Sequence, residues 1–197
     1  MTQLNDEQRA FLMKFKADLR KGNLTKLLKE LGRQNLTDKR AIMCYMLEHG
    51  VPVLSNMTTL SAGFIDGIDT VALTIPGNIK RIGREGIAEG QMKELIFEEG
   101  VEELASKSIA RCPTLQKVTL PNSLRNLQTA TFFRCPELKE VFIPDSIRVL
   151  PKDLFFRCSD ELVVLANFRD SKETRLKCVD SERDWYRHHL KWIKGGE

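Results

Sequence analysis

The sequence predicts an α/β solenoid, a short stack of similar coils built around a parallel sheet with a helical cap at each end. An apolar–x–apolar triplet recurs at intervals of 22, 23 and 23 residues, at positions 73–75, 95–97, 118–120 and 141–143. Further apolar residues follow each triplet at similar offsets, as Ile79, Ile82 and Ile87 follow the first. Amphipathic segments with helical spacing flank the repeats on both sides.

Each triplet fits a short strand whose outer residues point inward and whose middle residue points outward. Pro76, Pro121 and Pro144 directly follow three of the triplets. Proline cannot donate a hydrogen bond to the ladder, so it ends the strand. One such coil cannot bury its apolar face alone. We therefore expect successive coils to stack and their triplets to pair in parallel.

Five cysteines occur in the chain. Cys112, Cys135 and Cys158 occupy the same position in successive coils, which predicts a stack of free thiols in the core. A disulfide between neighbouring coils is the less favoured alternative. No C-x-x-C pair or paired Cys/His spacing is present, so we predict neither a metal site nor a cofactor.

The rows LPNSLRNLQTATFFRCPELKEV and IPDSIRVLPKDLFFRC carry the pattern most clearly. They resemble the leucine-rich repeats of the BspA type, over roughly half to three fifths of the chain. The resemblance implies a leucine-rich repeat stack that serves as a binding surface for protein partners. Two positions depart from the family pattern: Glu98 replaces a proline, and Gly90 replaces the cysteine.

Three regions are predicted along the chain: a helical N-terminal head or cap at 1–50, a solenoid of about five coils at 51–166, and a C-terminal cap at 167–197. A degenerate first coil starts at Val51, directly after the head. In the C-terminal cap, Trp185, His189, Trp192 and Ile193 fall on one side of a predicted terminal helix.

The composition, with 42% hydrophobic and 29% charged residues, is that of an ordinary folded domain. No apolar run approaches the roughly 20 residues that span a bilayer, so no membrane segment is predicted. The start of the chain lacks the basic and apolar regions of a secretory signal. We therefore expect a cytoplasmic protein.

Residues 1–50 hold 10 Lys and Arg against 6 Asp and Glu, and so carry most of the basic excess. A cap over the open end of the solenoid is the favoured interpretation of this region. The alternative is a basic head that contacts nucleic acid phosphates. Its candidate residues are Lys26, Lys29, Arg33, Lys39 and Arg40.

Two outward ladders are candidate binding surfaces. The first consists of the middle residues of the triplets, Thr74, Ile96, Thr119 and Phe142, with Leu165 in the last coil; they would form a partner groove or a dimer face unless flanking lysines cover them. The second precedes the cysteines and contains two phenylalanines and three arginines, namely Phe133, Phe156, Arg111, Arg134 and Arg157. Glu89, Glu137 and Asp160 are nearby acids that would neutralise these arginines in the structural alternative.

No catalytic motif such as G-x-S-x-G or H-E-x-x-H is present, so we predict no enzyme. The predicted function is a non-enzymatic protein–protein interaction module, with a nucleic-acid-associated protein or a self-assembling structural subunit as alternatives. The predicted protein-binding residues are Ile96, Thr119, Phe142, Phe133, Arg134, Phe156, Arg157 and Arg111.

Overall fold

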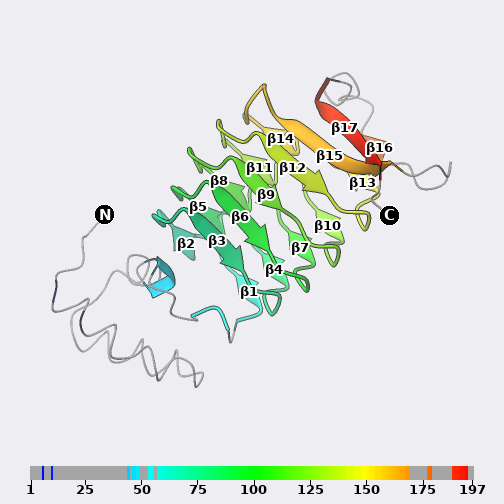
Figure 1. Cartoon of the computed structure of the whole chain (residues 1–197). Coiled ribbons are helices and arrows are strands. Elements are labelled where there is room, and N and C mark those ends of the chain that lie inside the picture. Colours follow the sequence, from blue (N-terminus) through cyan, green and yellow to red (C-terminus); the bar gives the residue numbers. More distant parts are fainter. Residues whose placement is uncertain are drawn as a thin grey trace.

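The computed structural model describes residues 6, 10, 44, 46–48, 53–55, 57–168, 177–178 and 188–194. Within them the chain winds into a β-solenoid whose strands all pair in parallel (Figure 1). The predicted parallel stack of about five coils is therefore confirmed. The solenoid is β rather than α/β, because the return arms at 57–168 contain short strands and turns. The segment between Ile82 and Ile87, each of which lies in a short strand, is too short to form a stable helix.

The predicted triplets form the front sheet, which is drawn as the broad arrows of Figure 1. Leu73 pairs with Leu95, and Val118 pairs with Val141, so equivalent residues lie side by side in successive coils. The strands, in spatial order, are β3 (Ala72–Ile75), β6 (Glu94–Phe97), β9 (Lys117–Thr119), β12 (Glu140–Ile143), β15 (Val163–Phe168) and β17 (Leu190–Lys194).

The return arms form two further sheets of two-residue strands. The second sheet contains β1 (Thr59–Leu60), β4 (Arg81–Ile82), β7 (Glu103–Leu104) and β10 (Asn126–Leu127), while β13 (Val149–Leu150) pairs separately with β16 (Lys177–Cys178). The third sheet contains β2 (Ile65–Asp66), β5 (Ile87–Ala88), β8 (Ile109–Ala110), β11 (Phe132–Phe133) and β14 (Phe155–Phe156). A front strand followed by two short return strands gives each coil three sides.

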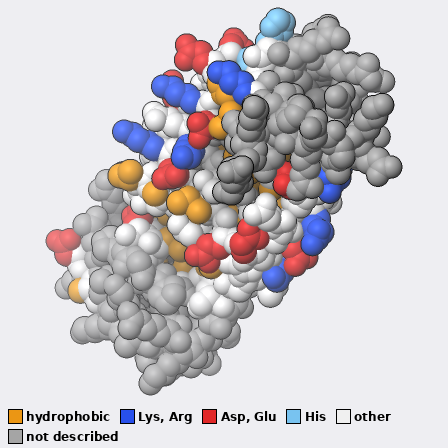
Figure 2. Space-filling model, turned by 45° about the vertical axis from the view of Figure 1, so that its right-hand side comes forward, with side chains coloured by type: hydrophobic (Ala, Val, Ile, Leu, Met, Phe, Trp, Pro, Cys, Tyr) orange, Lys and Arg blue, Asp and Glu red, His pale blue; other side chains and the backbone are white. Residues whose placement is uncertain are grey.

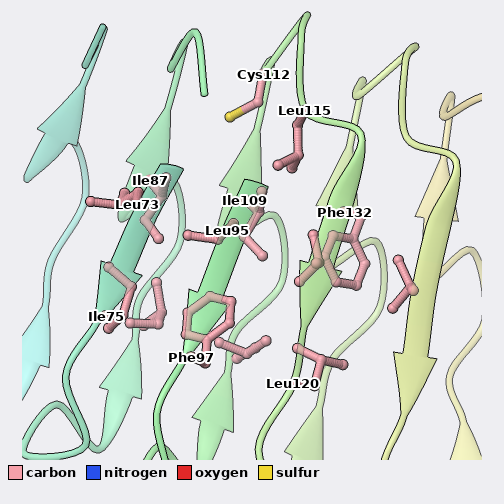
Figure 3. Packing of buried hydrophobic residues seen from close by; sticks show 14 of the residues in the cluster. Leu73, Ile75, Ile87, Leu95, Phe97, Ile109, Cys112, Leu115, Leu120 and Phe132 are labelled. Carbon is pink, nitrogen blue, oxygen red and sulfur yellow. The ribbon is translucent and has the colours of Figure 1, made fainter. Parts of the chain in front are cut away.

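The core runs along the solenoid axis between these sheets. Side chains of the front sheet, such as Leu95 and Phe97, lie near those of the third sheet, such as Ile109 (Figure 3). Phe132 is fully buried, and its ring stacks on that of Phe155 with centroids 5.2 Å apart. Burial of these large side chains is the main source of stability, because a coil has no other core.

The predicted cysteine stack is confirmed as a set of free thiols. Cys112 and Cys135 are fully buried, whereas Cys158 in the last complete coil is half-buried. Cys112 donates to the carbonyl of Ala110 at 3.5 Å, which helps to satisfy a thiol inside an apolar core.

The predicted head falls mainly outside the described residues. Those that the structure describes at 6, 10, 44 and 46–48 are helical. Met46 is fully buried and belongs to the core, as do Val53 and Leu54 at the start of the first coil. The helical cap as a whole stays a prediction.

The predicted C-terminal helix is wrong over Leu190–Lys194, which form strand β17. This strand pairs with β15, with Val164 opposite Leu190. The reason is the open edge of the sheet: β15 would otherwise present unpaired backbone donors and acceptors, which a further strand satisfies. Strand β15 also extends to Phe168, two residues past the predicted end of the solenoid. Among the described residues, no helix is long and apolar enough to cross a membrane.

Candidate functional site

Five side chains gather on the outer side of the third sheet and on the turns before and after it in the later coils. They are Lys107, Phe133, Arg134, Phe156 and Arg157, and we call this group the basic aromatic corner. Phe133 and Phe156 are the second residues of β11 and β14, and they pair with each other across the sheet. Because side chains alternate along a strand, they point outward while Phe132 and Phe155 fill the core.

The two outward rings are stacked, with centroids 5.6 Å apart and planes 2° from parallel. The Lys107 ammonium lies 4.5 Å from the centroid of Phe133. The guanidinium of Arg134 lies 5.2 Å from the same ring, and that of Arg157 lies 5.5 Å from Phe156. Cations at these distances are attracted by the negative faces of the rings. Phe156 is 38% exposed, one of the few large apolar side chains in that class among the described residues.

A repeated backbone corner aims the arginines in the same direction. Arg111, Arg134 and Arg157 have φ angles of 54°, 58° and 57°, in the left-handed region that few residues other than glycine adopt. Gly67, one of the residues in the same column, also has a positive φ. The cost of this conformation is offset by hydrogen bonds between coils, such as that from the Arg134 amide to the carbonyl of Phe156.

Arg111 is held by two carboxylates and is not available to a partner. Its Nε donates to Glu89 at 3.0 Å, and its Nη2 donates to Glu85 at 3.1 Å. The hydrogen bond from Arg111 lowers the pKa of Glu85 and, in return, raises the pKa of Arg111. The structural alternative therefore holds for this one arginine, which ties two coils together.

Arg134 and Arg157 have no such partners in the part of the chain that the structure describes. Glu85 and Glu89 belong to the coil before that of Arg111. For Arg134, the equivalent residues of the preceding coil are Lys107 and Arg111. For Arg157, they are Ala130 and Arg134, so neither arginine has a carboxylate at these positions. Within the described residues, neither guanidinium pairs with a carboxylate, and Glu137 and Asp160 do not reach them. Both side chains are exposed.

The other predicted binding residues lie on a different side of the solenoid. Ile96, Thr119 and Phe142 face outward from the front sheet, as predicted, with Ile96 opposite Thr119 and Thr119 opposite Phe142. Ile96 and Phe142 are half-buried, so this ladder is not an open apolar patch. On the face in Figure 2, hydrophobic side chains are interspersed with charged ones. The structure thus separates the predicted site into two surfaces.

The remaining predictions concern nucleic acid and metal. Lys26, Lys29, Arg33, Lys39 and Arg40, the candidate nucleic acid contacts, lie outside the described residues. No group of three or more His, Cys, Asp or Glu side chains that could hold a metal ion occurs in the described part of the chain.

Lys107 is a member of the basic aromatic corner that the sequence analysis did not name. It lies in a column of positive-φ residues that also contains Glu85, Ala130 and Asp153. Alignment of the coils places it two residues before Ile109, as Ala130 is before Phe132. That offset would have identified it, because equivalent positions in stacked coils are neighbours.

Comparison with known proteins agrees with the repeat architecture. The family model described as the BspA type leucine rich repeat region matches residues 58–172 with six copies. No curated protein and no solved structure gives a significant match to the chain.

Proposed function

The chain belongs to the family of BspA-type leucine-rich repeats, and on this basis we propose that it is a non-enzymatic module that binds a protein partner on the rigid surface of its coils. The stacked backbone supports this function, because a preformed surface loses little conformational entropy on binding. Repeat stacks also present equivalent side chains as regular ladders on which a partner can register.

One observation carries the proposed location: Arg134 and Arg157 lie against outward phenylalanines and have no carboxylate partner among the described residues. Arginine and aromatic side chains are the residues that dominate the energy of protein interfaces. A guanidinium stacked on a ring keeps its N–H donors free for a partner. We place the binding surface at the basic aromatic corner rather than at the ladder of outward residues on the front sheet, whose apolar members are half-buried.

Capture of proteins from a lysate of the source cells, with this protein immobilised as bait, tests the proposal. The variant carries Phe156→Ala with Arg157→Ala. The matched control carries Val149→Ala with Arg148→Ala, an exposed apolar residue and an adjacent arginine from the same coil but at another corner. We expect one protein to be captured by wild type and control and lost by the variant, with or without nuclease. Capture that disappears with nuclease, or that all three baits share, would contradict the proposal.

A further inference from the structure

The corner has an uneven distribution of charge along the solenoid axis. At its N-terminal end, Glu85 and Glu89 share the guanidinium of Arg111, and Arg84 lies 3.9 Å from Glu85. Toward the C-terminal end the same columns present Lys107, Arg134 and Arg157, which form no ion pair with a carboxylate in the residues that the structure describes, and one acid, Asp153, in the last coil. The positive charge therefore accumulates over the last complete coils.

This arrangement places like charges on neighbouring coils. Arg134 and Arg157 succeed one another in one column, after Arg111 with its two carboxylate partners, and neighbouring strands of a sheet lie about 4.8 Å apart. Adjacent like charges repel each other, and an anion bound between them would relieve that repulsion. The two stacked rings stabilise the cations only partly, since cation–π attraction at exposed sites is modest.

From this geometry we infer that the basic aromatic corner binds an acidic, extended segment of the partner protein that runs along the solenoid axis. The inference rests on the proposed function and adds the chemistry of the partner. Alternate carboxylates of an extended chain lie about 7 Å apart. Long arginine side chains on successive coils reach both of them, and each guanidinium accommodates a carboxylate in a bidentate manner.

Phe156 adds an apolar element to this site. Its ring is 38% exposed, stacks on the ring of Phe133 and lies 5.5 Å from the guanidinium of Arg157. The aliphatic part of a glutamate side chain packs on such a ring while its carboxylate meets the guanidinium. A nucleic acid duplex presents its phosphates and would use only the charges, whereas an acidic segment uses both elements. A single strand can also stack its bases on an aromatic ring, and the oligothymidylate measurement below distinguishes it from the protein segment.

Binding of a short oligoglutamate peptide to the full chain tests the inference, with NMR chemical shifts to locate it. The variant is Arg134→Gln with Arg157→Gln. The control is Arg125→Gln with Arg148→Gln, which changes the net charge equally at another corner. We expect the variant to weaken binding about tenfold, since each exposed ion pair contributes up to about fivefold. The control should weaken binding less than twofold, and oligoglutamine should not bind.

Other outcomes would overturn the inference. Equal weakening by variant and control would show that only net charge matters. Tighter binding of a short oligothymidylate at the same residues would assign the corner to nucleic acid. Self-association that the variant abolishes in sedimentation would assign it to a second copy of the chain.

The inference and the proposed function can fail separately. If oligoglutamate does not bind but the captured protein is still lost with Phe156→Ala and Arg157→Ala, the corner binds a partner of different chemistry. If oligoglutamate does not bind and the variant also captures the same proteins as wild type, the proposed function fails as well.

Discussion

Phe133 lies directly beside Phe156 in the third sheet, with ring planes 2° from parallel. This relationship follows from the backbone, because strands β11 and β14 pair in register and equivalent side chains adopt the same orientation. The 5.6 Å between the ring centroids is close to the spacing of neighbouring strands. The same repetition places Phe132 on Phe155 in the core. One pair of strands thus builds an inner stack in the core and an outer stack at the surface, where we propose the binding site.

Replacement of the inner ring should strongly destabilise the protein. Phe132 is fully buried, so Phe132→Ala should lower the free energy of unfolding by about 3–5 kcal/mol. Val149→Ala, at a side chain that is 54% exposed, should change it by less than about 0.5 kcal/mol. Urea denaturation monitored by circular dichroism measures both. Similar losses for the two variants would show that the core does not run through Phe132.

A glycine at the corner after the front sheet should be sensitive to a single methyl group. A Cβ atom on Gly77 would lie 1.8 Å from the backbone oxygen of Glu99 in the next coil. On Gly90 it would meet mainly the side chain of Met92, which can move. We expect Gly77→Ala to cost about 2–3 kcal/mol and Gly90→Ala about 1 kcal/mol. Thermal unfolding compares them, and the reverse order would contradict the close approach of the coils.

The sequence was sufficient to predict the solenoid because the period is a property of every coil. Leu73, Leu95 and Val118 recur at nearly constant spacing, and that spacing alone determines their register in the front sheet. The shape of the return arm was harder to predict. The period gives the length of a coil but not where the backbone bends, so it does not show that the ladder of Phe142 and the ladder of Phe156 lie on different sides of the solenoid.

The end of the solenoid was also beyond sequence reasoning. Residues 190–194 have apolar spacing that fits a helix as well as a strand, and the unpaired edge of β15 decides between them. Similarly, whether an arginine of this column forms an ion pair depends on the residue at the equivalent position of the preceding coil. There Glu89 lies in the column beside Arg111, while Arg111 itself lies beside Arg134.

One carboxylate should make stability depend on pH. The amides of Asn122 and Ser123 donate to Glu99 at 2.8 and 2.9 Å, and these hydrogen bonds, that from Asn122 foremost, hold the pKa of Glu99 below its usual value. A lowered folded-state pKa means that the stabilisation is present above the unfolded pKa and is lost as the pH falls through the folded one.

Glu99→Gln should therefore lower the melting temperature at neutral pH and bring it closer to wild type in acid. Glu137→Gln, at an exposed carboxylate in another turn, serves as the control and should leave the pH profile unchanged. Melting curves between neutral pH and about pH 3 measure the difference. A gap between wild type and Glu99→Gln that is constant across this range would rule out the carboxylate as the titrating group.

The cysteine ladder should react in a defined order, starting from its C-terminal end. The hydrogen bond with Cys135 lowers the pKa of Cys158 and raises that of Cys112, to which burial adds. For Cys135 the contact with Cys112 lowers the pKa, but the bond with Cys158 and burial outweigh it and raise the pKa to about 12. Since the thiolate is the nucleophile and Cys158 is also the most accessible of the three, iodoacetamide at about pH 8 should modify Cys158 first. Peptide mass spectrometry over time measures the order of modification. Urea-unfolded protein is the control, in which all three cysteines should react alike. Modification of Cys135 as fast as Cys158 in the folded protein would refute the stacked arrangement.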